Sequence, residues 1–273
     1  MTSGPRETET RCGAEMGKKE LSIIMPAHGE ADNLRLLLPE LRAVAGSLVS
    51  QPEILVVDAK SPVDDTREVC IENGVVCLLG GKSYADAIRT GIRASTGEYV
   101  IIIDADGSHN PRFLPVLWEK REVADVVIAS RYAPGGKTDN PWLLEAMSRI
   151  LNLVFRLVVG IPVRDVSNDF RLYRGDLLRS LELTCQHFDV IEEILARLLW
   201  DRPSNGLRIL EVPYHQEQRK LGKPKRNLIV FCLHYLGTLY RLRRMRDNYR
   251  ALRAKLDLAE NPSTQQPRER EKK

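Results

Sequence analysis

Two aspartates, one residue apart, follow a short apolar run. Tyr99–Asp104 reads YVIIID, and Ala105, Asp106 and Gly107 come next. Side chains alternate across an extended strand, so Asp104 and Asp106 are predicted to point to the same side. Two carboxylates held close together repel each other unless a cation lies between them. The spacing therefore indicates a site for Mg²⁺ or Mn²⁺, and the plainer alternative is an Asp-Gly turn with exposed carboxylates.

Apolar runs that alternate with helical patterns predict the elements that would position this pair. Tyr84–Ala94, Trp142–Val159 and Val190–Trp200 have the apolar spacing of helices. Short runs rich in Ile, Leu and Val are predicted strands: Leu21–Ala27, Glu53–Asp58, Val75–Leu79, Tyr99–Asp104, residues 126–132 and residues 207–215. Residues 164–176, which read RDVSNDFRLYRGD, are predicted to form a polar loop. Strands that alternate with helices predict an α/β fold with a mostly parallel sheet flanked by helices.

In a parallel sheet, ligands bind at the carboxyl ends of the strands. The polar segments that follow the first, second and fourth predicted strands begin at Pro26, Asp58 and Asp104. We therefore expect these three segments to meet in one crevice. Glu30, in the first segment, is predicted to contact the ribose or base of a nucleotide; the alternative is that it only complements the dipole of the following helix.

The composition is that of an ordinary globular protein. The chain has 273 residues, a net charge of +4 and 29% charged residues. Its five cysteines have no metal-ligand spacing, so we expect free thiols in a reducing compartment. No apolar run reaches the length of about 20 residues that a membrane-spanning helix needs. We expect a cytoplasmic protein with no nucleic-acid partner.

A basic segment precedes a helix near the C-terminus. Residues 219–226 read RKLGKPKR, which is either a solvated loop or one that binds phosphates. Residues 228–242 are largely apolar and are followed by a cluster of arginines, which is typical of a helix at a membrane surface; core packing would give the same apolar face. We predict disordered residues 1–19, a catalytic domain at 20–226, an amphipathic helical extension at 227–257 and a disordered tail at 258–273.

Several segments, taken together and in this order, resemble family 2 glycosyltransferases of the GT-A (nucleotide-diphospho-sugar transferase) fold. The likeness is closest to dolichol-phosphate mannose synthases and related polyprenyl-phosphate glycosyltransferases. The segments that carry it are IIMPAHGEADNL, ILVVDAKSPVDDT, GKSYADAIRTGIRASTGEYVIIIDADGSHNP, VVIASRY, SNDFRLYR and EVPYHQEQRKLGKPKRN.

The resemblance implies a metal-dependent inverting transfer of a hexose from a nucleotide sugar, with mannose from GDP-mannose expected, to a polyprenyl or dolichyl phosphate at the membrane face. It implies Asp104 and Asp106 as ligands of Mg²⁺ or Mn²⁺. The implied nucleotide-sugar site consists of Pro26, Ala27, Glu30, Asp58, Lys82, Asp104, Ala105 and Asp106. The implied sites for the acceptor and its phosphate consist of Arg131, Arg171, Arg219, Lys223 and Lys225. The implied catalytic residues are Asp106, Arg131, Asp169 and Arg171.

The chain departs from the family pattern at Ala59-Lys60, where an acidic residue and a glycine are usual, and at Asp169, where a glycine or serine is usual. Two alternatives follow. One is transfer from a UDP- or dTDP-sugar to a hydroxyl, with Asp169, Glu192 or Glu193 as the base. The other is a non-catalytic subunit that binds sugar nucleotides.

Overall fold

The computed structural model describes residues 19–201, 206–219, 221 and 228–260. Within these residues, the main sheet has the strand order β3-β2-β1-β4-β7-β5-β8. Its strands pair in parallel except β7, which runs antiparallel to both of its neighbours. The strands are β1 (Leu21–Pro26), β2 (Glu53–Asp58), β3 (Val76–Leu79), β4 (Tyr99–Ile102), β5 (Val126–Ser130), β7 (Arg171–Arg174) and β8 (Ile209–Pro213).

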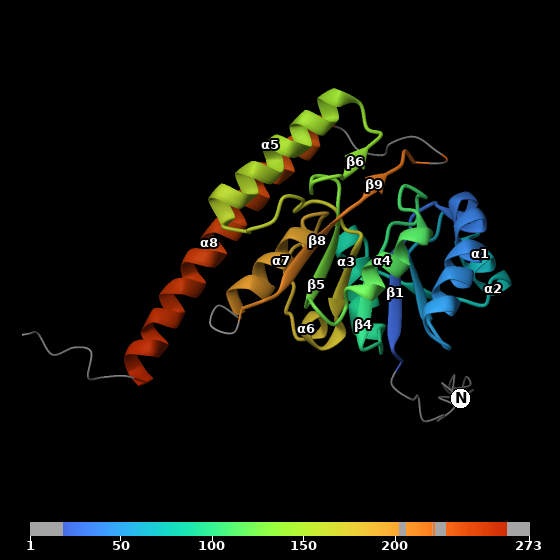
Figure 1. Ribbon diagram of the computed structural model, residues 1–273, viewed down its shortest axis with the longest axis horizontal. Coiled ribbons are helices and arrows are strands. Elements are labelled where there is room, and N and C mark those ends of the chain that lie inside the picture. The colour runs from blue at the N-terminus through green and yellow to red at the C-terminus, as the bar shows by residue number, and fades with distance from the viewer. Residues whose placement is uncertain (1–18, 202–205, 220, 222–227, 261–273) are drawn as a thin grey trace, which may run out of the picture.

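Helices cover both faces of this sheet, and each face has its own apolar core (Figure 1). On one face lie α1 (Ala31–Leu48), α2 (Thr66–Glu72), the short 3₁₀ helix Pro111–Phe113 and α4 (Leu114–Glu119). On the other face lie α3 (Tyr84–Ala94), α5 (Trp142–Val159), α6 (Gly175–Arg179), α7 (Val190–Asp201) and α8 (Leu228–Glu260). The predicted α/β fold with a mostly parallel sheet is confirmed.

Local capping explains why two helices have the predicted bounds. The side chain of Ser83 accepts a hydrogen bond from the backbone N–H of Asp86 and so caps the start of α3. Gly160, at φ +82°, ends α5 in the left-handed conformation that glycine adopts without strain. The apolar spacing predicted both helices with these bounds, and the caps give the physical reason for the bounds.

The structure corrects three expectations. Strand β4 ends at Ile102, so Asp104 is not part of it. Residues 171–174, predicted to belong to a polar loop, form β7 inside the main sheet. The predicted strand over 207–215 is divided into β8 and β9 (His215–Gln216), and β9 pairs with β6 (Lys137–Thr138) in a separate two-stranded sheet.

Helix α8 runs beside α5, and the two helices project from the sheet at one end (Figure 1). Leu239 and Leu242 of α8 are buried in the core, and Thr238 donates a hydrogen bond to Asp189 at 2.8 Å. The helix continues beyond the predicted extension to Glu260. Within the described residues, no helix combines the length and apolarity that crossing a membrane requires. Most of the predicted disordered lead-in and tail lies outside these residues.

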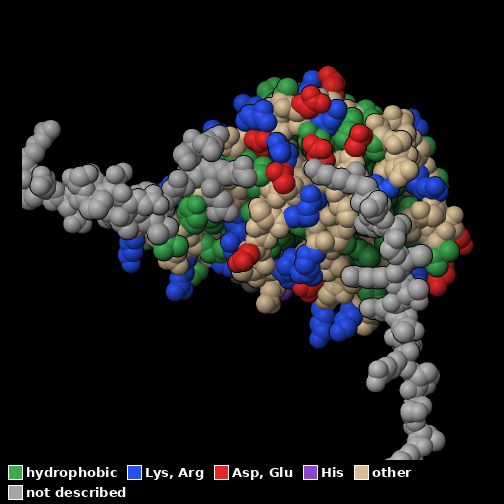
Figure 2. Space-filling view, turned by 90° about the horizontal axis from the view of Figure 1, so that it is seen from below, with side chains coloured by type: hydrophobic (Ala, Val, Ile, Leu, Met, Phe, Trp, Pro, Cys, Tyr) green, Lys and Arg blue, Asp and Glu red, His purple; other side chains and the backbone are tan. Residues whose placement is uncertain are grey.

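Figure 2 shows the molecule from below, at the end of the sheet where β1 begins. Basic, acidic and hydrophobic side chains are intermixed on this face. This face therefore does not present a field of one sign. Cys70, Cys77 and Cys185 are free thiols, as predicted for these three positions. The chemistry-bearing side chains gather at the opposite end, beyond the carboxyl ends of the parallel strands.

Candidate active site

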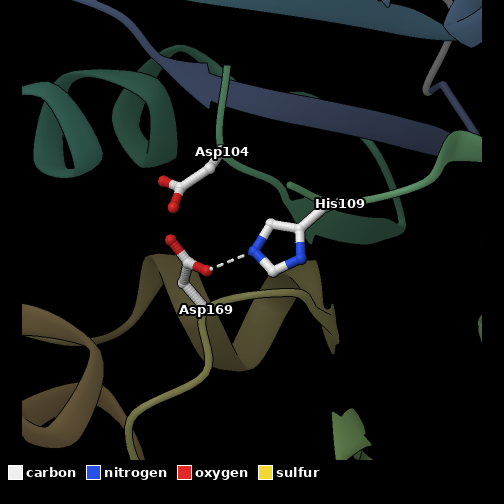
Figure 3. A group of neighbouring side chains, drawn as sticks. All are labelled: Asp104, His109 and Asp169. Atoms are coloured by element: carbon white, nitrogen blue, oxygen red, sulfur yellow. Dashed lines mark hydrogen bonds and ion pairs between the residues drawn. The ribbon is translucent and has the colours of Figure 1, made fainter. Parts of the chain in front are cut away.

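The pairing of β4 with β7 brings Asp104 next to Asp169. The two strands are antiparallel, and Ile102 lies opposite Arg171. Asp104 comes two residues after Ile102, and Asp169 two residues before Arg171. In an antiparallel pair these positions follow each other across the ladder, so the two carboxylates meet just beyond it. Figure 3 shows their side chains pointing toward one another.

Asp169 is held by hydrogen bonds at both of its carboxylate oxygens. His109 Nε2 lies 2.9 Å from Asp169 Oδ1 (Figure 3). The hydroxyl of Tyr84, at the start of α3, donates to Asp169 Oδ2 at 2.6 Å and lies 3.5 Å from Asp104 Oδ1. The ring of Tyr84 packs on Phe188 with a centroid distance of 4.9 Å. The start of α3 and the segment after β4 therefore both contact the carboxylate of Asp169.

Burial alone would raise the pKa of Asp169, because it removes the carboxylate from water. The hydrogen bond and charge of His109 and the hydrogen bond from Tyr84 outweigh burial and hold the pKa of Asp169 below its ordinary value. Asp169 is therefore an anion that its neighbours stabilise.

Asp104, His109 and Asp169 also have the geometry of a cation site. One ligand atom from each lies within 4.8 Å of the others, and the two later residues are buried. Two carboxylates and one imidazole can bind Mn²⁺, and carboxylates with phosphate oxygens suit Mg²⁺. The residues therefore fit a divalent cation, with His109 and Asp169 as candidate ligands besides Asp104.

Asp106 has different neighbours from Asp104. Both residues follow β4, with Asp104 in an irregular stretch and Asp106 in a turn, so the alternation of a strand does not apply to them. Asp106 Oδ1 accepts the backbone N–H of Ser108 at 3.0 Å, and Asp106 Oδ2 lies 3.6 Å from Arg219 Nη1. The argument that a shared strand aligns the two carboxylates is therefore wrong, whereas their role as metal ligands stays a prediction.

Residues predicted to bind the nucleotide lie at the carboxyl ends of β1 and β2. Pro26 ends β1, and the backbone N–H of Ala27 donates to the carbonyl of Val57 at 2.9 Å. Asp58 ends β2 and is fully buried, and burial raises the pKa of its carboxyl. Its Oδ2 has no hydrogen-bond partner among the described residues. Lys82 is exposed just before α3.

Glu30, at the entry to α1, forms an ion pair with Arg219. Arg219 Nη2 lies 2.6 Å from each carboxylate oxygen of Glu30. Glu30 also accepts a hydrogen bond from the side chain of Asn33 at 2.7 Å. The basic segment is thus joined to the predicted nucleotide site through Arg219, while Lys223 and Lys225 lie outside the described residues.

Arg131 and Arg171 both have protein partners. Arg131 Nε and Nη2 bind the buried carboxylate of Asp165 at 2.8 and 2.6 Å, and Nη2 also donates to Ser167 Oγ at 2.9 Å. Arg171 is fully buried and donates to the carbonyl of Val166 at 2.5 Å. These contacts give both arginines a structural role, and their predicted contact with phosphate stays a prediction.

The two glutamates considered as a base for a hydroxyl acceptor are both buried. Glu193 accepts hydrogen bonds from the backbone N–H groups of Thr184 and Cys185 and from Arg197. Burial raises its pKa, but these donors outweigh burial and lower it from 4.5 to about 2. Glu193 is therefore engaged in joining α7 to the segment before it.

Two residues of the site, His109 and Tyr84, are not among those predicted from the sequence. His109 lies in the same DADGSHNP segment as the two aspartates, and that proximity was the available signal. Tyr84 had no such signal, because its contact with Asp169 depends on the fold bringing the start of α3 next to the residue two positions before β7.

A family profile and two similar proteins of known name all indicate the same family for this chain. The profile of glycosyl transferase family 2 matches residues 22–181. The chain is 33% identical to the undecaprenyl-phosphate mannosyltransferase of Micrococcus luteus over 219 residues, which cover 74% of this chain and 85% of that protein. It is 30% identical to the polyprenol monophosphomannose synthase of Mycolicibacterium smegmatis over 224 residues, which cover 74% of this chain and 79% of that protein.

Solved structures with the same fold include glucosyl-3-phosphoglycerate synthase from Mycobacterium tuberculosis in complex with Mn²⁺, UDP and glucosyl-3-phosphoglycerate. The TM-score is 0.62 at 20% identity, and the match covers 82% of this chain and 80% of that one. A complex of the same enzyme with Mg²⁺ and UDP also has a TM-score of 0.62, at 18% identity, covering 82% of this chain and 79% of that one. The predicted GT-A fold is confirmed.

Proposed function

Because this chain belongs to glycosyl transferase family 2, we propose that it transfers mannose from GDP-mannose to a polyprenyl phosphate, with inversion at the anomeric carbon. The chain is a glycosyltransferase, and the proposal concerns its donor and acceptor. The observation that carries it is the identity of 33% and 30% with two enzymes named for mannose and a polyprenyl phosphate carrier, each over 74% of the chain.

The carboxylates beyond β4 support the binding of a nucleotide diphosphate with a cation. We propose that Asp104 and Asp106 hold Mg²⁺ or Mn²⁺, with His109 and Asp169 ligating the ion or orienting Asp104. When bound, the cation neutralises the charge that develops on the leaving diphosphate. Asp58 ends β2 at the same edge of the sheet, and we propose that it contributes to the site of the base.

The proposal that the acceptor is a phosphate is supported by the hydrogen bonds that already engage the acidic side chains. A hydroxyl acceptor needs a general base, whereas a phosphate is already an anion. Both oxygens of Asp169 accept hydrogen bonds, and Glu193 is buried among donors. Direct attack by a phosphate oxygen on the anomeric carbon needs neither residue as a base. Arg219 is the described basic residue nearest Asp106 that can interact with a phosphate.

Contact with a membrane surface is supported by α5. Trp142, Leu143, Ile150, Leu153 and Leu157 are exposed, and their spacing places them on one side of the helix; we call them the α5 apolar stripe. Trp142 is 78% exposed and Leu157 71% exposed. Exposed Arg149 and Arg156 belong to the same helix. An apolar face flanked by arginines suits the interface of an anionic bilayer, where a polyprenyl phosphate presents its head group.

Helix α8 was predicted to make this contact, but several of its arginines bind within the protein. Arg241 pairs with Asp189 at 2.5 Å, and Arg246 donates to the carbonyl of Val158 at the end of α5 at 2.9 Å. Arg244 is exposed. The side chains of residues 228–235 lie outside those described. We therefore propose that α5 makes the main contact with lipid, and that α8 supports it.

The direct test is a transfer assay with purified protein, Mn²⁺ and a panel of GDP-mannose, UDP-glucose and dTDP-glucose. Each donor is offered a polyprenyl phosphate or the polyprenol with a free hydroxyl, and mass spectrometry identifies the product. We expect mannosyl phosphoryl polyprenol from GDP-mannose alone. Transfer from a UDP- or dTDP-sugar, or to the polyprenol, would overturn the assignment. Donor binding without transfer or hydrolysis would instead indicate a non-catalytic subunit.

A further inference from the structure

Arg219 lies between two carboxylates that follow neighbouring strands. Glu30 follows β1, Asp106 follows β4, and the two strands are paired in the sheet. Arg219 Nη2 lies 2.6 Å from both oxygens of Glu30, whereas Nη1 lies 3.6 Å from Asp106 Oδ2. The contact with Glu30 is thus a charge-assisted hydrogen bond, and the contact with Asp106 is too long to be one.

The surroundings of this ion pair fix the orientation of the guanidinium. Nε of Arg219 donates to the carbonyl of Leu221 at 2.6 Å, and Asn33 holds Glu30 Oε2 at 2.7 Å. The side chain of Glu30 is 9% exposed and that of Arg219 is 20% exposed. Because a guanidinium is planar, fixing Nε and Nη2 also fixes the direction of Nη1. That nitrogen faces Asp106, the carboxylate beside which the diphosphate of the donor is proposed to bind.

We infer that Glu30 is a positioning residue for Arg219, and that its carboxylate holds the guanidinium so that Nη1 faces the diphosphate of the donor. The inference rests on the proposed function and replaces the expected contact of Glu30 with the ribose or base. Holding a charged donor in place before the substrate arrives reduces the entropy lost on binding. Arg219 touches the diphosphate, and Glu30 acts through Arg219.

The two roles of Glu30 predict different ligand dependence. A residue that acts through Arg219 affects only ligands that carry phosphate, so the affinity for guanosine stays unchanged when Glu30 is replaced. A residue that contacts the ribose or base affects guanosine and GDP alike. The two roles also predict different GDP affinities for the double variant. If Glu30 acts through Arg219, the losses of affinity caused by the two substitutions are not additive.

The experiment measures GDP binding with Mn²⁺ by calorimetry and guanosine binding by ligand-observed NMR. The variants are Glu30→Gln, Arg219→Ala and the double variant, with thermal melting to confirm folding. Glu40→Gln is the matched control, because Glu40 lies on the same helix and pairs with Arg112 at 2.7 Å. We expect each single variant to weaken GDP binding by about tenfold or more. We expect the double variant to be no weaker than Arg219→Ala, and guanosine binding and the control to match the wild type.

The inference would be overturned if Glu30→Gln lost equal affinity for guanosine and GDP, or if its GDP affinity were unchanged. It would also be overturned if the losses of GDP affinity in the two single variants added up in the double variant. These results leave the proposed function intact, since the wild type still binds GDP. If the wild type binds UDP in place of GDP, the donor assignment falls, and the same comparison with uridine and UDP decides the role of Glu30. A wild type that binds no nucleoside diphosphate overturns both proposals.

Discussion

His109 and Asp169 are 60 residues apart in the sequence, yet the imidazole Nε2 lies 2.9 Å from the carboxylate Oδ1. Both side chains are nearly inaccessible to solvent, with 1% and 12% exposed. The His109 ring is packed against Phe170 at 5.1 Å and Tyr214 at 6.0 Å between centroids. The imidazole is therefore fixed by packing and by Asp169 together, and it sets the orientation of a carboxylate that faces Asp104.

The first prediction concerns His109 and the cation. We expect Asp104→Asn to abolish turnover and Mn²⁺-dependent donor binding, because Asp104 belongs to both candidate ligand sets. We expect His109→Asn to weaken Mn²⁺ binding by about tenfold, whether His109 ligates the ion or orients Asp169. Electron paramagnetic resonance of free Mn²⁺ measures the affinity directly. If His109→Asn has the Mn²⁺ affinity of the wild type, His109 and Asp169 do not contribute to the cation site.

The sequence predicted those parts of the fold that depend on local signals. The apolar spacing of residues 84–94 and 142–159 predicted α3 and α5, and in the structure Ser83 caps the start of α3 and Gly160 ends α5. The apolar runs of β1, β2 and β5 predicted buried strands, and Asp58 was correctly placed at the end of β2. Local chemistry therefore fixed which elements form and which end of the sheet carries polar residues.

The partners of the site residues could not be predicted in the same way. Residues 171–174 contain two arginines, and their sequence predicts a polar loop, although the strand they form pairs with both β4 and β5. The guanidinium of Arg171 can be buried because it donates hydrogen bonds to backbone carbonyls, which replace those that it would make to water. The meeting of Asp104 with Asp169 depends on this antiparallel pairing, and a pairing between distant segments leaves no periodic signal in either segment.

The second prediction concerns the buried pair Arg131–Asp165. Asp165 is fully buried, and removing Arg131 would leave its charge without a partner. We expect Arg131→Ala to lower the free energy of unfolding by about 3–5 kcal/mol. Arg131→Lys should also be destabilising, because lysine lacks the two parallel donors. Urea unfolding measures the loss.

The matched control for Arg131 is Arg208→Ala. Arg208 also binds an aspartate, Asp125, through two nitrogens, but its side chain is 54% exposed. Ion pairs in contact with water contribute little to stability, so this variant should unfold close to the wild type. If both variants lose the same stability, burial does not determine the strength of the Arg131 pair. If Arg131→Lys retains stability but loses turnover, its predicted contact with phosphate is supported instead.

The third prediction concerns Glu193 and the stability of the fold at low pH. Because its pKa is lowered in the folded protein from 4.5 to about 2, Glu193 contributes stability that is fully present above pH 4.5 and is lost as the pH falls toward 2. We expect Glu193→Gln to lower the free energy of unfolding at pH 7 by up to about 3 kcal/mol. The difference between variant and wild type should shrink below pH 4.5. Urea unfolding from pH 7 to pH 3 measures it, with exposed Glu182→Gln as the control. A difference that stays constant with pH would show that packing, not charge, accounts for the loss.

The fourth prediction concerns the α5 apolar stripe and the membrane. Ile150 and Leu157 are exposed on α5, and burying such a side chain in a bilayer interface is worth about 1.5–3 kcal/mol. A carboxylate at either position removes that gain and is repelled by anionic lipid. We therefore expect Ile150→Glu and Leu157→Glu each to lower partitioning onto anionic vesicles by more than tenfold. Flotation of the full chain with vesicles of anionic or neutral lipid measures this.

The control for the stripe is Leu36→Glu. Leu36 is 58% exposed on α1, which covers the opposite face of the sheet, so its substitution adds the same charge without touching α5. We expect this variant to bind vesicles nearly as the wild type does. The stripe variants should also lose transfer to a long-chain polyprenyl phosphate in vesicles while retaining transfer to a short, water-soluble one, because the site beyond β4 is unchanged. Equal vesicle binding by all three variants would show that α5 is not the membrane contact. Loss of transfer to both acceptors would instead place the stripe in the acceptor site itself.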